Sequence, residues 1–108
     1  METKTHAVTM ENFESIVDSH PLVVLDFWAA WCAPCRTFAP IFEQTAEIFP
    51  DIYFGKVDIE AAPELAEAFQ VRSVPTIMAF RNTELIFEQS GLLHPEQFAE
   101  MIAQLRLS

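Results

Sequence analysis

Apolar residues along this chain follow two rhythms, one typical of buried strands and the other typical of helices. Runs rich in β-branched and aromatic residues predict strands at 22–28, 52–58 and 76–80. The first run is apolar at almost every position, which is typical of a strand buried on both faces of a sheet. The segments between and after these runs repeat their apolar residues every three or four positions, as helices do.

That spacing predicts four helices. Phe13, Ile16 and Val17 form the apolar stripe of the first helix. Thr9 is placed to cap its start, and His20 ends it because a proline follows. The other three helices are predicted at 38–49, at 62–69 and from 95 onward.

Prolines mark particular points of these helices. Pro34 suits the first turn of the helix after the cysteines, where a missing N–H costs nothing. Pro40 falls inside the same helix and predicts a kink, because its ring clashes with the carbonyl of Arg36. Pro63 and Pro95 stand at the starts of the third and fourth helices.

A hairpin completes the predicted sheet. Its turn is predicted at 81–84, where Asn82 accepts a positive φ best, and its returning strand at 85–89. A short strand at 7–8 precedes all of these elements. Strands that alternate with helices pair in parallel, whereas the hairpin adds antiparallel strands. We therefore predict one α/β domain over 1–108, with a mixed central sheet of four to five strands flanked by four helices.

Composition and charge limit the partners and the location. Of the 108 residues, 51% are hydrophobic and ten are Phe, which is enough for one sizeable core. The formal charge of −10 disfavours nucleic acid and anionic membranes, because both attract Lys and Arg. The sequence shows neither a signal-peptide core nor an apolar run long enough to span a bilayer. We expect a cytoplasmic protein, since a lone cysteine pair also fits a reducing compartment.

The only two cysteines are Cys32 and Cys35, with two residues between them. This spacing suits either a shared metal ion or a small disulfide ring. Zinc takes four nitrogen or sulfur ligands, and the sequence offers no second Cys pair, so a metal requires a cluster that bridges two chains. The scattered histidines are expected to be solvated or capping; they are His6, His20 and His94. A Cys-x-x-Cys between a strand and a helix favours redox exchange.

The two sulfurs are expected to differ in role. Cys32 falls just before the predicted helix, where free backbone N–H groups and the helix dipole favour a thiolate. We expect its exposed sulfur to attack a substrate disulfide. Cys35 lies one turn deeper and is expected to resolve the mixed disulfide. The short link through Ala33 and Pro34 keeps this second thiol close.

Asp26 interrupts the most apolar strand. Burial of a carboxylate raises its pKa, so Asp26 is expected to accept the proton of Cys35. Lys56, on the neighbouring strand, is expected to be its charge partner. The alternative is an aspartate that points outward at the end of the strand.

Val74 and Pro75 precede the third long strand. By itself this position predicts an ordinary trans proline, because only ~5–6% of such bonds are cis. A proline here leaves the backbone edge of Val74 unpaired. An extended substrate is expected to pair with that edge.

Together these features resemble the thioredoxin family, from Phe13 to Leu105. The residues that carry the resemblance are, in order, Val24 to Ala29, Trp31 to Arg36, Ala39 and Pro40, Lys56 to Asp58, and Val71 to Thr76. A Cys-x-x-Cys alone is weak evidence, whereas all of these motifs in this order are highly specific. The resemblance implies the thioredoxin fold and a protein-disulfide reductase with a redox-active disulfide and no bound cofactor.

The resemblance also implies roles for the matching positions. They are a nucleophile at Cys32, a resolving thiol at Cys35, a buried acid at Asp26, and a cis proline facing the disulfide at Pro75. The implied docking surface consists of Trp31, Ala33, Pro34, Val74, Gly91 and Leu92. Reducing equivalents are expected from NADPH through a flavoprotein thioredoxin reductase. The expected substrates are disulfide-containing proteins, and the expected state is a monomer without a metal.

Two positions depart from the family pattern. Ala33 stands where the motif usually has Gly, so the reduction potential is left open. Thr83 replaces the usual Gly of the last hairpin, with an effect expected to be local. Pro34 favours a reductase over an oxidase or isomerase. A binding module or holdase on the same fold is the other alternative, because fold alone does not decide function.

Charge adds one hypothesis. Three of the six basic residues, Arg36, Lys56 and Arg72, fall in or beside the motifs, while acidic residues fill the helices. The redox face is therefore expected to be less negative than the rest of the surface and to accept acidic partners.

Overall fold

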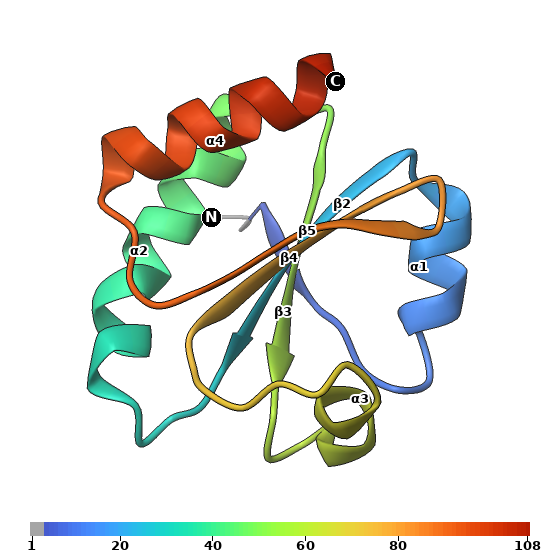
Figure 1. The fold of residues 1–108 in the computed structure, drawn as a ribbon, viewed down its shortest axis with the longest axis vertical. Helices are drawn as coiled ribbons and strands as arrows, with labels where there is room; N and C mark the ends of the chain where they lie inside the picture. Colours follow the sequence, from blue (N-terminus) through green and yellow to red (C-terminus); the bar gives the residue numbers. More distant parts are fainter. Residues whose placement is uncertain (1–3) are drawn as a thin grey trace.

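The computed structural model describes residues 4–108, which form a five-stranded mixed sheet and four helices (Figure 1). The strands are β1 (Thr5–Ala7), β2 (Leu22–Trp28), β3 (Tyr53–Asp58), β4 (Thr76–Arg81) and β5 (Glu84–Ser90). The helices are α1 (Phe13–Ser19), α2 (Ala33–Ile48), α3 (Pro63–Ala68) and α4 (Pro95–Leu107). The order of elements is the predicted one, which confirms the α/β class.

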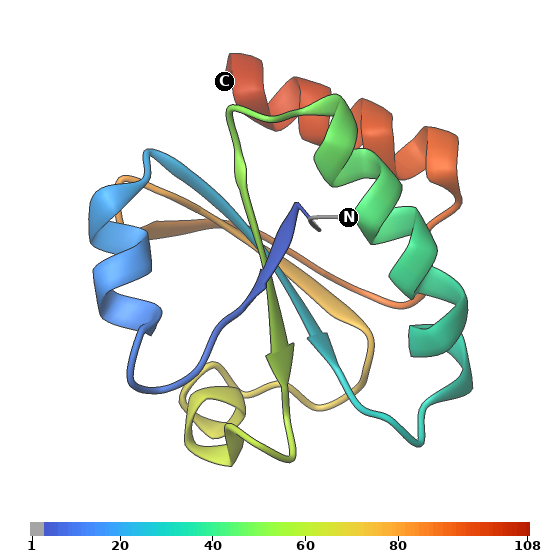
Figure 2. The same ribbon diagram turned by 180° about the vertical axis from the view of Figure 1, so that it is seen from behind.

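β2 occupies the centre of the sheet, whose strand order is β1-β3-β2-β4-β5. β1 and β2 run parallel to β3, whereas β4 runs antiparallel to β2 and β5 antiparallel to β4. The view from behind brings β1 and β3 to the front (Figure 2). The sheet is therefore mixed, with the predicted hairpin at one edge and β1 at the other.

Each face of the sheet is covered by two helices, with α2 and α4 on one side and α1 and α3 on the other (Figures 1 and 2). The core under α2 and α4 includes Val24, Phe38, Phe42, Phe54 and Phe98. The core under α1 and α3 includes Ile16, Val17, Leu25, Phe27 and Leu65. β2 supplies residues to both cores, because successive side chains of a strand point to opposite faces.

β2 is buried on both faces, as its unbroken apolar run predicts. Val23, Val24 and Leu25 have no exposed surface. Such a run is stable only where both faces of the strand are covered. The end of this strand leads directly into the cysteine motif, so the most buried strand positions the candidate chemistry.

The start of α1 differs from the prediction, because Thr9 does not cap it. Asn12 is the N-cap residue, and its Oδ1 accepts a hydrogen bond from the backbone N–H of Thr9 at 2.7 Å. The carbonyl oxygen of Thr9 accepts from the N–H of Phe13 at 3.0 Å, so Thr9 takes part through its backbone. Both residue types cap helices, and sequence spacing does not decide which one stands at the turn. The helix ends before His20, as predicted.

The prolines of α2 lie where they were predicted, with Pro34 in the first turn and Pro40 inside the helix. The kink expected at Pro40 stays a prediction. No helix within residues 4–108 is long and apolar enough to cross a membrane.

The turn between β4 and β5 has two residues with positive φ. They are Asn82 at 49° and Thr83 at 73°. Two successive positive φ values suit the twist of a tight hairpin, which confirms the prediction for Asn82. The same conformation is unfavourable for a β-branched residue such as Thr83.

Candidate active site

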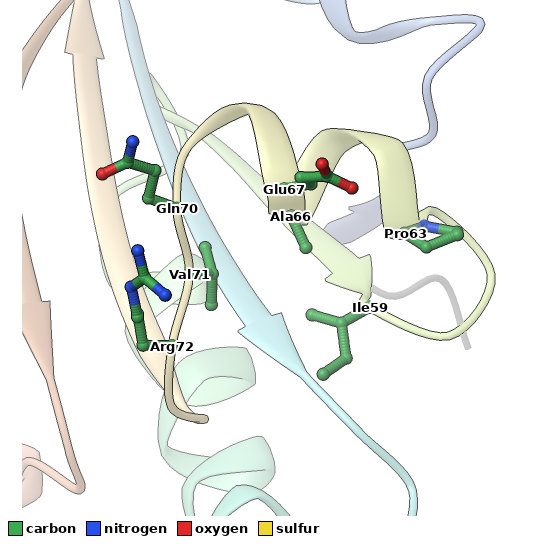
Figure 3. Close-up of a pocket in the computed structure, with 7 residues that line it drawn as sticks. All are labelled: Ile59, Pro63, Ala66, Glu67, Gln70, Val71 and Arg72. Atoms are coloured by element: carbon green, nitrogen blue, oxygen red, sulfur yellow. The ribbon is translucent and has the colours of Figure 1, made fainter.

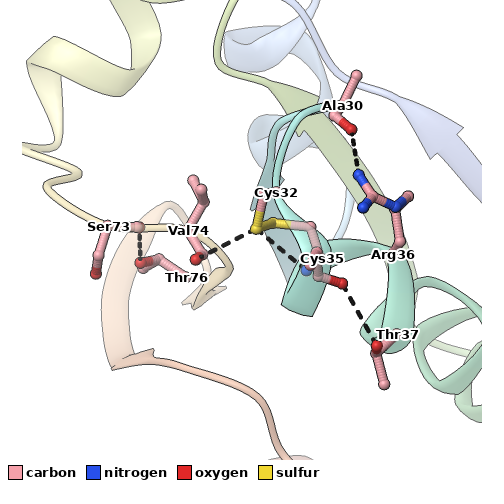
Figure 4. The surroundings of a disulfide bond; sticks show 9 residues. Ala30, Cys32, Cys35, Arg36, Thr37, Ser73, Val74 and Thr76 are labelled. Atoms are coloured by element: carbon pink, nitrogen blue, oxygen red, sulfur yellow. Dashed lines mark hydrogen bonds between the residues drawn. A yellow bond between two sulfur atoms is a disulfide. The ribbon is translucent and has the colours of Figure 1, made fainter.

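The cysteine pair lies where β2 passes into α2 (Figure 4). Cys32 is the N-cap residue of α2, and Cys35 lies in its first turn. Their sulfurs form a disulfide, with Cα atoms 5.2 Å apart. The pair is thus held between the central strand and the start of a long helix, which fixes its geometry.

A backbone donor distinguishes the two sulfurs. The N–H of Cys35 donates to Sγ of Cys32 at 3.1 Å. N–H groups in the first turn of a helix have no partner within the helix, and the helix dipole adds positive potential there. Once the disulfide is reduced, this arrangement favours a thiolate on Cys32.

The disulfide faces the loop before β4. Sγ of Cys32 lies 3.5 Å from the carbonyl oxygen of Val74, and the bond from Val74 to Pro75 is cis, as the resemblance implied. Oγ1 of Thr76 donates to the carbonyl oxygen of Ser73 at 2.6 Å, across this loop (Figure 4). The loop therefore sets backbone polar groups directly beside the Cys32 sulfur.

Both cysteines are buried, which corrects the expectation of an exposed Cys32. Cys32 is 4% exposed and Cys35 is 3% exposed. Their neighbours in this cluster are Ala29, Trp28, Ile59 and Val74. These neighbours come from different segments, so the covering of Cys32 is invisible in the local sequence. The two sulfurs differ in hydrogen bonding rather than in exposed area.

The first turn of α2 is tied back to the loop that precedes it. Nη1 of Arg36 donates to the carbonyl oxygen of Ala30 at 2.8 Å (Figure 4). The backbone N–H of Arg36 donates to the carbonyl oxygen of Cys32 at 3.2 Å. A positive charge is therefore held close to the cysteine motif.

Asp26 is buried in β2, with 1% of its surface exposed, so the outward-pointing alternative is wrong. It stands in register with Lys56 on β3 and Ile77 on β4. It faces the same side as Val24, since side chains two positions apart share a face. Neither carboxylate oxygen has a hydrogen-bond partner within the described chain. Burial raises the pKa of Asp26 from 3.8 to about 7, against the opposing effect of the Lys56 charge.

Lys56 acts on Asp26 through its charge and not through an ion pair. Within residues 4–108 the one ion pair joins Arg106 to Asp51. Nζ of Lys56 instead lies 5.1 Å from the centre of the Trp28 ring. This is the geometry of a cation–π contact. The charge of Lys56 thus lowers the pKa of Asp26, but by less than burial raises it.

The residues expected to dock substrates include two large apolar side chains at the surface. Trp31 and Leu92 are 65% and 41% exposed, which is high for large apolar side chains. Gly91 has a φ of 99°, and a Cβ placed there would meet nothing within 4 Å. Its N–H donates to the carbonyl oxygen of Pro75 at 2.8 Å, which brings it to the disulfide loop. The other three expected residues are exposed or half-buried; they are Ala33, Pro34 and Val74.

A hollow of about 600 Å³ lies beside α3 (Figure 3). Ile59 lines it and also packs against the cysteine cluster, so the hollow and the cluster share this one residue. Arg72 and Glu67 place one charge of each sign on its rim. Ile59 has no signal in the sequence, because an apolar residue outside a strand or helix carries no distinguishing pattern, whereas Val71 belongs to the motif that runs to Thr76.

The histidines take structural positions. The ring of His6 stacks on Tyr53 with centres 4.9 Å apart, and Nδ1 of His20 lies 2.9 Å from the carbonyl oxygen of Ile16. His94 is the N-cap residue of α4. In the described part of the chain, no three His, Cys, Asp or Glu side chains are grouped to hold a metal ion.

Comparison with known proteins decides the family, since a family model described as thioredoxin matches residues 4–104. The chain belongs to the thioredoxin family. It is 46% identical to the putative thioredoxin 2 of Streptomyces coelicolor over 96% of this chain and 78% of that protein. The thioredoxin of Plasmodium falciparum is 29% identical with a TM-score of 0.86, over 92% of this chain and 97% of that one. A thioredoxin variant of Halobacterium salinarum is 28% identical with a TM-score of 0.87, over 96% and 94%.

Membership and the disulfide together identify a thioredoxin-type dithiol–disulfide oxidoreductase. The solved thioredoxins confirm the thioredoxin fold. The family works through a redox-active disulfide without a bound cofactor. It acts on disulfide substrates and is itself reduced by a reductase.

Proposed function

We propose that this thioredoxin reduces protein disulfides, with Cys32 as nucleophile and Cys35 as resolving thiol. One observation carries the proposal. The Cys32 sulfur accepts a helix-start N–H at 3.1 Å and lies 3.5 Å from the Val74 carbonyl oxygen. The sulfur therefore combines stabilisation of a negative charge with a neighbouring backbone edge for a substrate.

In the first step, the Cys32 thiolate attacks one sulfur of the substrate disulfide. A new S–S bond joins Cys32 to the substrate, the substrate S–S bond breaks, and the leaving thiolate takes up a proton. The substrate chain pairs with the backbone of Val74 and packs on Trp31 and Leu92. Gly91 lets the substrate backbone approach closely, because no Cβ stands in its way.

In the second step, Cys35 resolves the mixed disulfide. Asp26 accepts the proton of the Cys35 thiol, and the new thiolate attacks Sγ of Cys32. The bond between Cys32 and Cys35 forms, and the second substrate sulfur leaves as a thiolate that takes up a proton. The substrate disulfide is reduced to a dithiol, and the protein dithiol is oxidised. A carboxyl with a pKa of about 7 exchanges protons readily at neutral pH.

Turnover requires that the disulfide be reduced again. We assign this step to NADPH acting through a thioredoxin reductase in the cytoplasm, with the chain working as a single-domain monomer. Positive charge at Arg36 and Arg72, beside the motif and the hollow, supports docking of acidic partners on a chain of net charge −10.

The direct test is reduction of insulin with dithiothreitol as electron donor. Cys32→Ser is expected to lower the rate to that of dithiothreitol alone. Cys35→Ser is expected to trap a mixed disulfide, because the substrate cannot be released. Wild-type protein that is no faster than dithiothreitol alone would contradict the proposal and favour the binding-module alternative.

A redox titration against glutathione separates a reductase from an oxidase. A potential more negative than that of the glutathione couple supports reduction of substrates. A more positive potential supports the oxidase or isomerase alternative, whatever the insulin assay shows.

A further inference from the structure

The segment from Ser73 to Thr76, which leads into β4, is held by the end of β5. The N–H of Gly91 donates to the carbonyl oxygen of Pro75 at 2.8 Å. One residue earlier, Oγ of Ser90 lies 3.1 Å from Oγ1 of Thr76, which is its register partner on β4. The end of β5 therefore contacts this segment twice, once through its backbone and once through a side chain.

The hydrogen bonds of Thr76 have a definite direction. A hydroxyl group has a single hydrogen, and Thr76 donates its own to the carbonyl oxygen of Ser73 at 2.6 Å (Figure 4). The Ser90 hydroxyl is therefore the donor in its contact with Thr76. The two bonds form a relay from Ser90 through Thr76 to Ser73, and each bond in such a chain strengthens the other.

The relay passes through a buried hydroxyl between two exposed residues. Thr76 is 1% exposed, whereas Ser73 and Ser90 are exposed. Packing therefore does little to hold Ser73, so its hydrogen bond to Thr76 matters more. Val74 lies between Ser73 and Pro75, whose carbonyl oxygens both accept hydrogen bonds. Within the described chain, the backbone of Val74 makes no hydrogen bond to another backbone group. Its edge is thus held on both sides and stays open to a substrate.

We propose that Ser90 and Thr76 are positioning residues, which hold the Val74 edge ready for an extended substrate chain. The inference rests on the proposed function. The pair acts through the loop, because it is the Val74 carbonyl oxygen that lies 3.5 Å from Sγ of Cys32. An edge that is already ordered lowers the cost of binding a chain. Disulfides within polypeptides therefore gain from the relay, whereas a small disulfide without a chain to pair does not.

The test compares two disulfides, insulin and hydroxyethyl disulfide, in single turnovers of the reduced full-length protein. The loss of protein thiols is followed by alkylation at a series of disulfide concentrations. Thr76→Val removes the hydroxyl at nearly constant shape and should raise the half-saturating insulin concentration about tenfold. Ser90→Ala removes only the first donor of the relay and should raise it about threefold. Both variants should reduce hydroxyethyl disulfide within about twofold of the wild-type rate.

Three further variants separate a relay from a general loss of structure. Because Ser90 acts through Thr76, the double variant of Thr76→Val and Ser90→Ala should match Thr76→Val alone. Thr76→Ser keeps the hydroxyl and should behave like wild type. Ser15→Ala removes an exposed hydroxyl of α1 and is the control, with both disulfides reduced as by wild type. Multiplied effects in the double variant, or equal losses with the two disulfides, overturn the proposal.

Circular dichroism shows whether each variant is folded, and Ser90→Ala decides the matter alone if Thr76→Val is not. Unchanged insulin kinetics in Ser90→Ala, with wild type active on both disulfides, refute only the positioning role. Wild-type protein that reduces neither disulfide refutes the proposed function itself.

Discussion

β2 presents alternate residues to the two faces of the sheet, and the two sets differ in kind. Towards α1 and α3 it presents Val23, Leu25 and Phe27, none of which has exposed surface. Towards α2 and α4 it presents Val24 and then Asp26, whose carboxylate is equally buried and has no hydrogen-bond partner in the described chain. One face is therefore fully apolar, whereas the other holds a group that folding disfavours.

This difference separates what stabilises the fold from what serves the chemistry. Burial alone does not explain a carboxylate in the central strand, since an apolar residue would be more stable there. Its position on the α2 side, on the strand that leads into the cysteine motif, fits a role in proton transfer. Substitutions on the two faces should change stability in opposite directions, and a substitution in the β4–β5 turn, outside both faces, should change it least.

Phe27→Ala should weaken the apolar face. The ring of Phe27 is fully buried and lies edge-on to Phe69, with centres 6.4 Å apart. Its removal leaves a cavity, so the free energy of unfolding should fall by about 3–5 kcal/mol. Urea denaturation followed by circular dichroism measures this change. A loss below about 1 kcal/mol would mean that this core collapses around the gap.

Asp26→Ala, on the other face of β2, should raise the free energy of unfolding, whereas Phe27→Ala lowers it. The pKa of Asp26 is raised from 3.8 to about 7, so the folded protein binds this proton more tightly than the unfolded chain. Wild-type stability therefore falls as pH rises from about 4 to about 7, and the loss is complete above that range. Asp26→Ala should be more stable than wild type by about 2–4 kcal/mol near pH 8, and by almost nothing below about pH 4.

The same variant should reduce insulin more slowly near neutral pH, because Cys35 loses its proton acceptor. Urea melts at the two pH values and the insulin assay measure the two effects. Asp18→Ala removes an exposed carboxylate of α1 and is the control, with little change expected in either. If Asp26→Ala is no more stable than wild type at the higher pH, the buried acid does not destabilise the fold.

Thr83→Gly should give the smallest effect, in the β4–β5 turn and away from both faces of β2. Thr83 has a φ of 73°, which is unfavourable for a β-branched residue and neutral for Gly. The change should raise the free energy of unfolding by about 0.5–1 kcal/mol and leave insulin reduction unchanged. Thr37→Gly, at an exposed position of α2, should lower it by about 0.3 kcal/mol, since Gly weakens helices slightly more than Thr does. If Thr83→Gly lowers stability as Thr37→Gly does, the positive φ at position 83 does not disfavour Thr.

Much of the fold was readable from local patterns. The apolar run at 22–28 identified the central strand, and the three- and four-residue spacing identified all four helices. The hairpin followed from the turn chemistry of Asn82. The buried state of Asp26 followed from its place in an apolar run, because no outward face exists on such a strand. The cis bond before Pro75 came from the family resemblance, since the position alone favours trans.

Contacts between distant segments were readable only in the folded chain. Cys32 is covered by Val74, some forty residues away in sequence, and no local pattern records that covering. Lys56 was predicted beside Asp26, yet its ammonium turns to the Trp28 ring. Periodicity encodes which side of an element is buried, because that depends on the spacing of neighbouring residues. Which side chain meets which depends on register and on how elements cross, and these are set only when the whole core packs together.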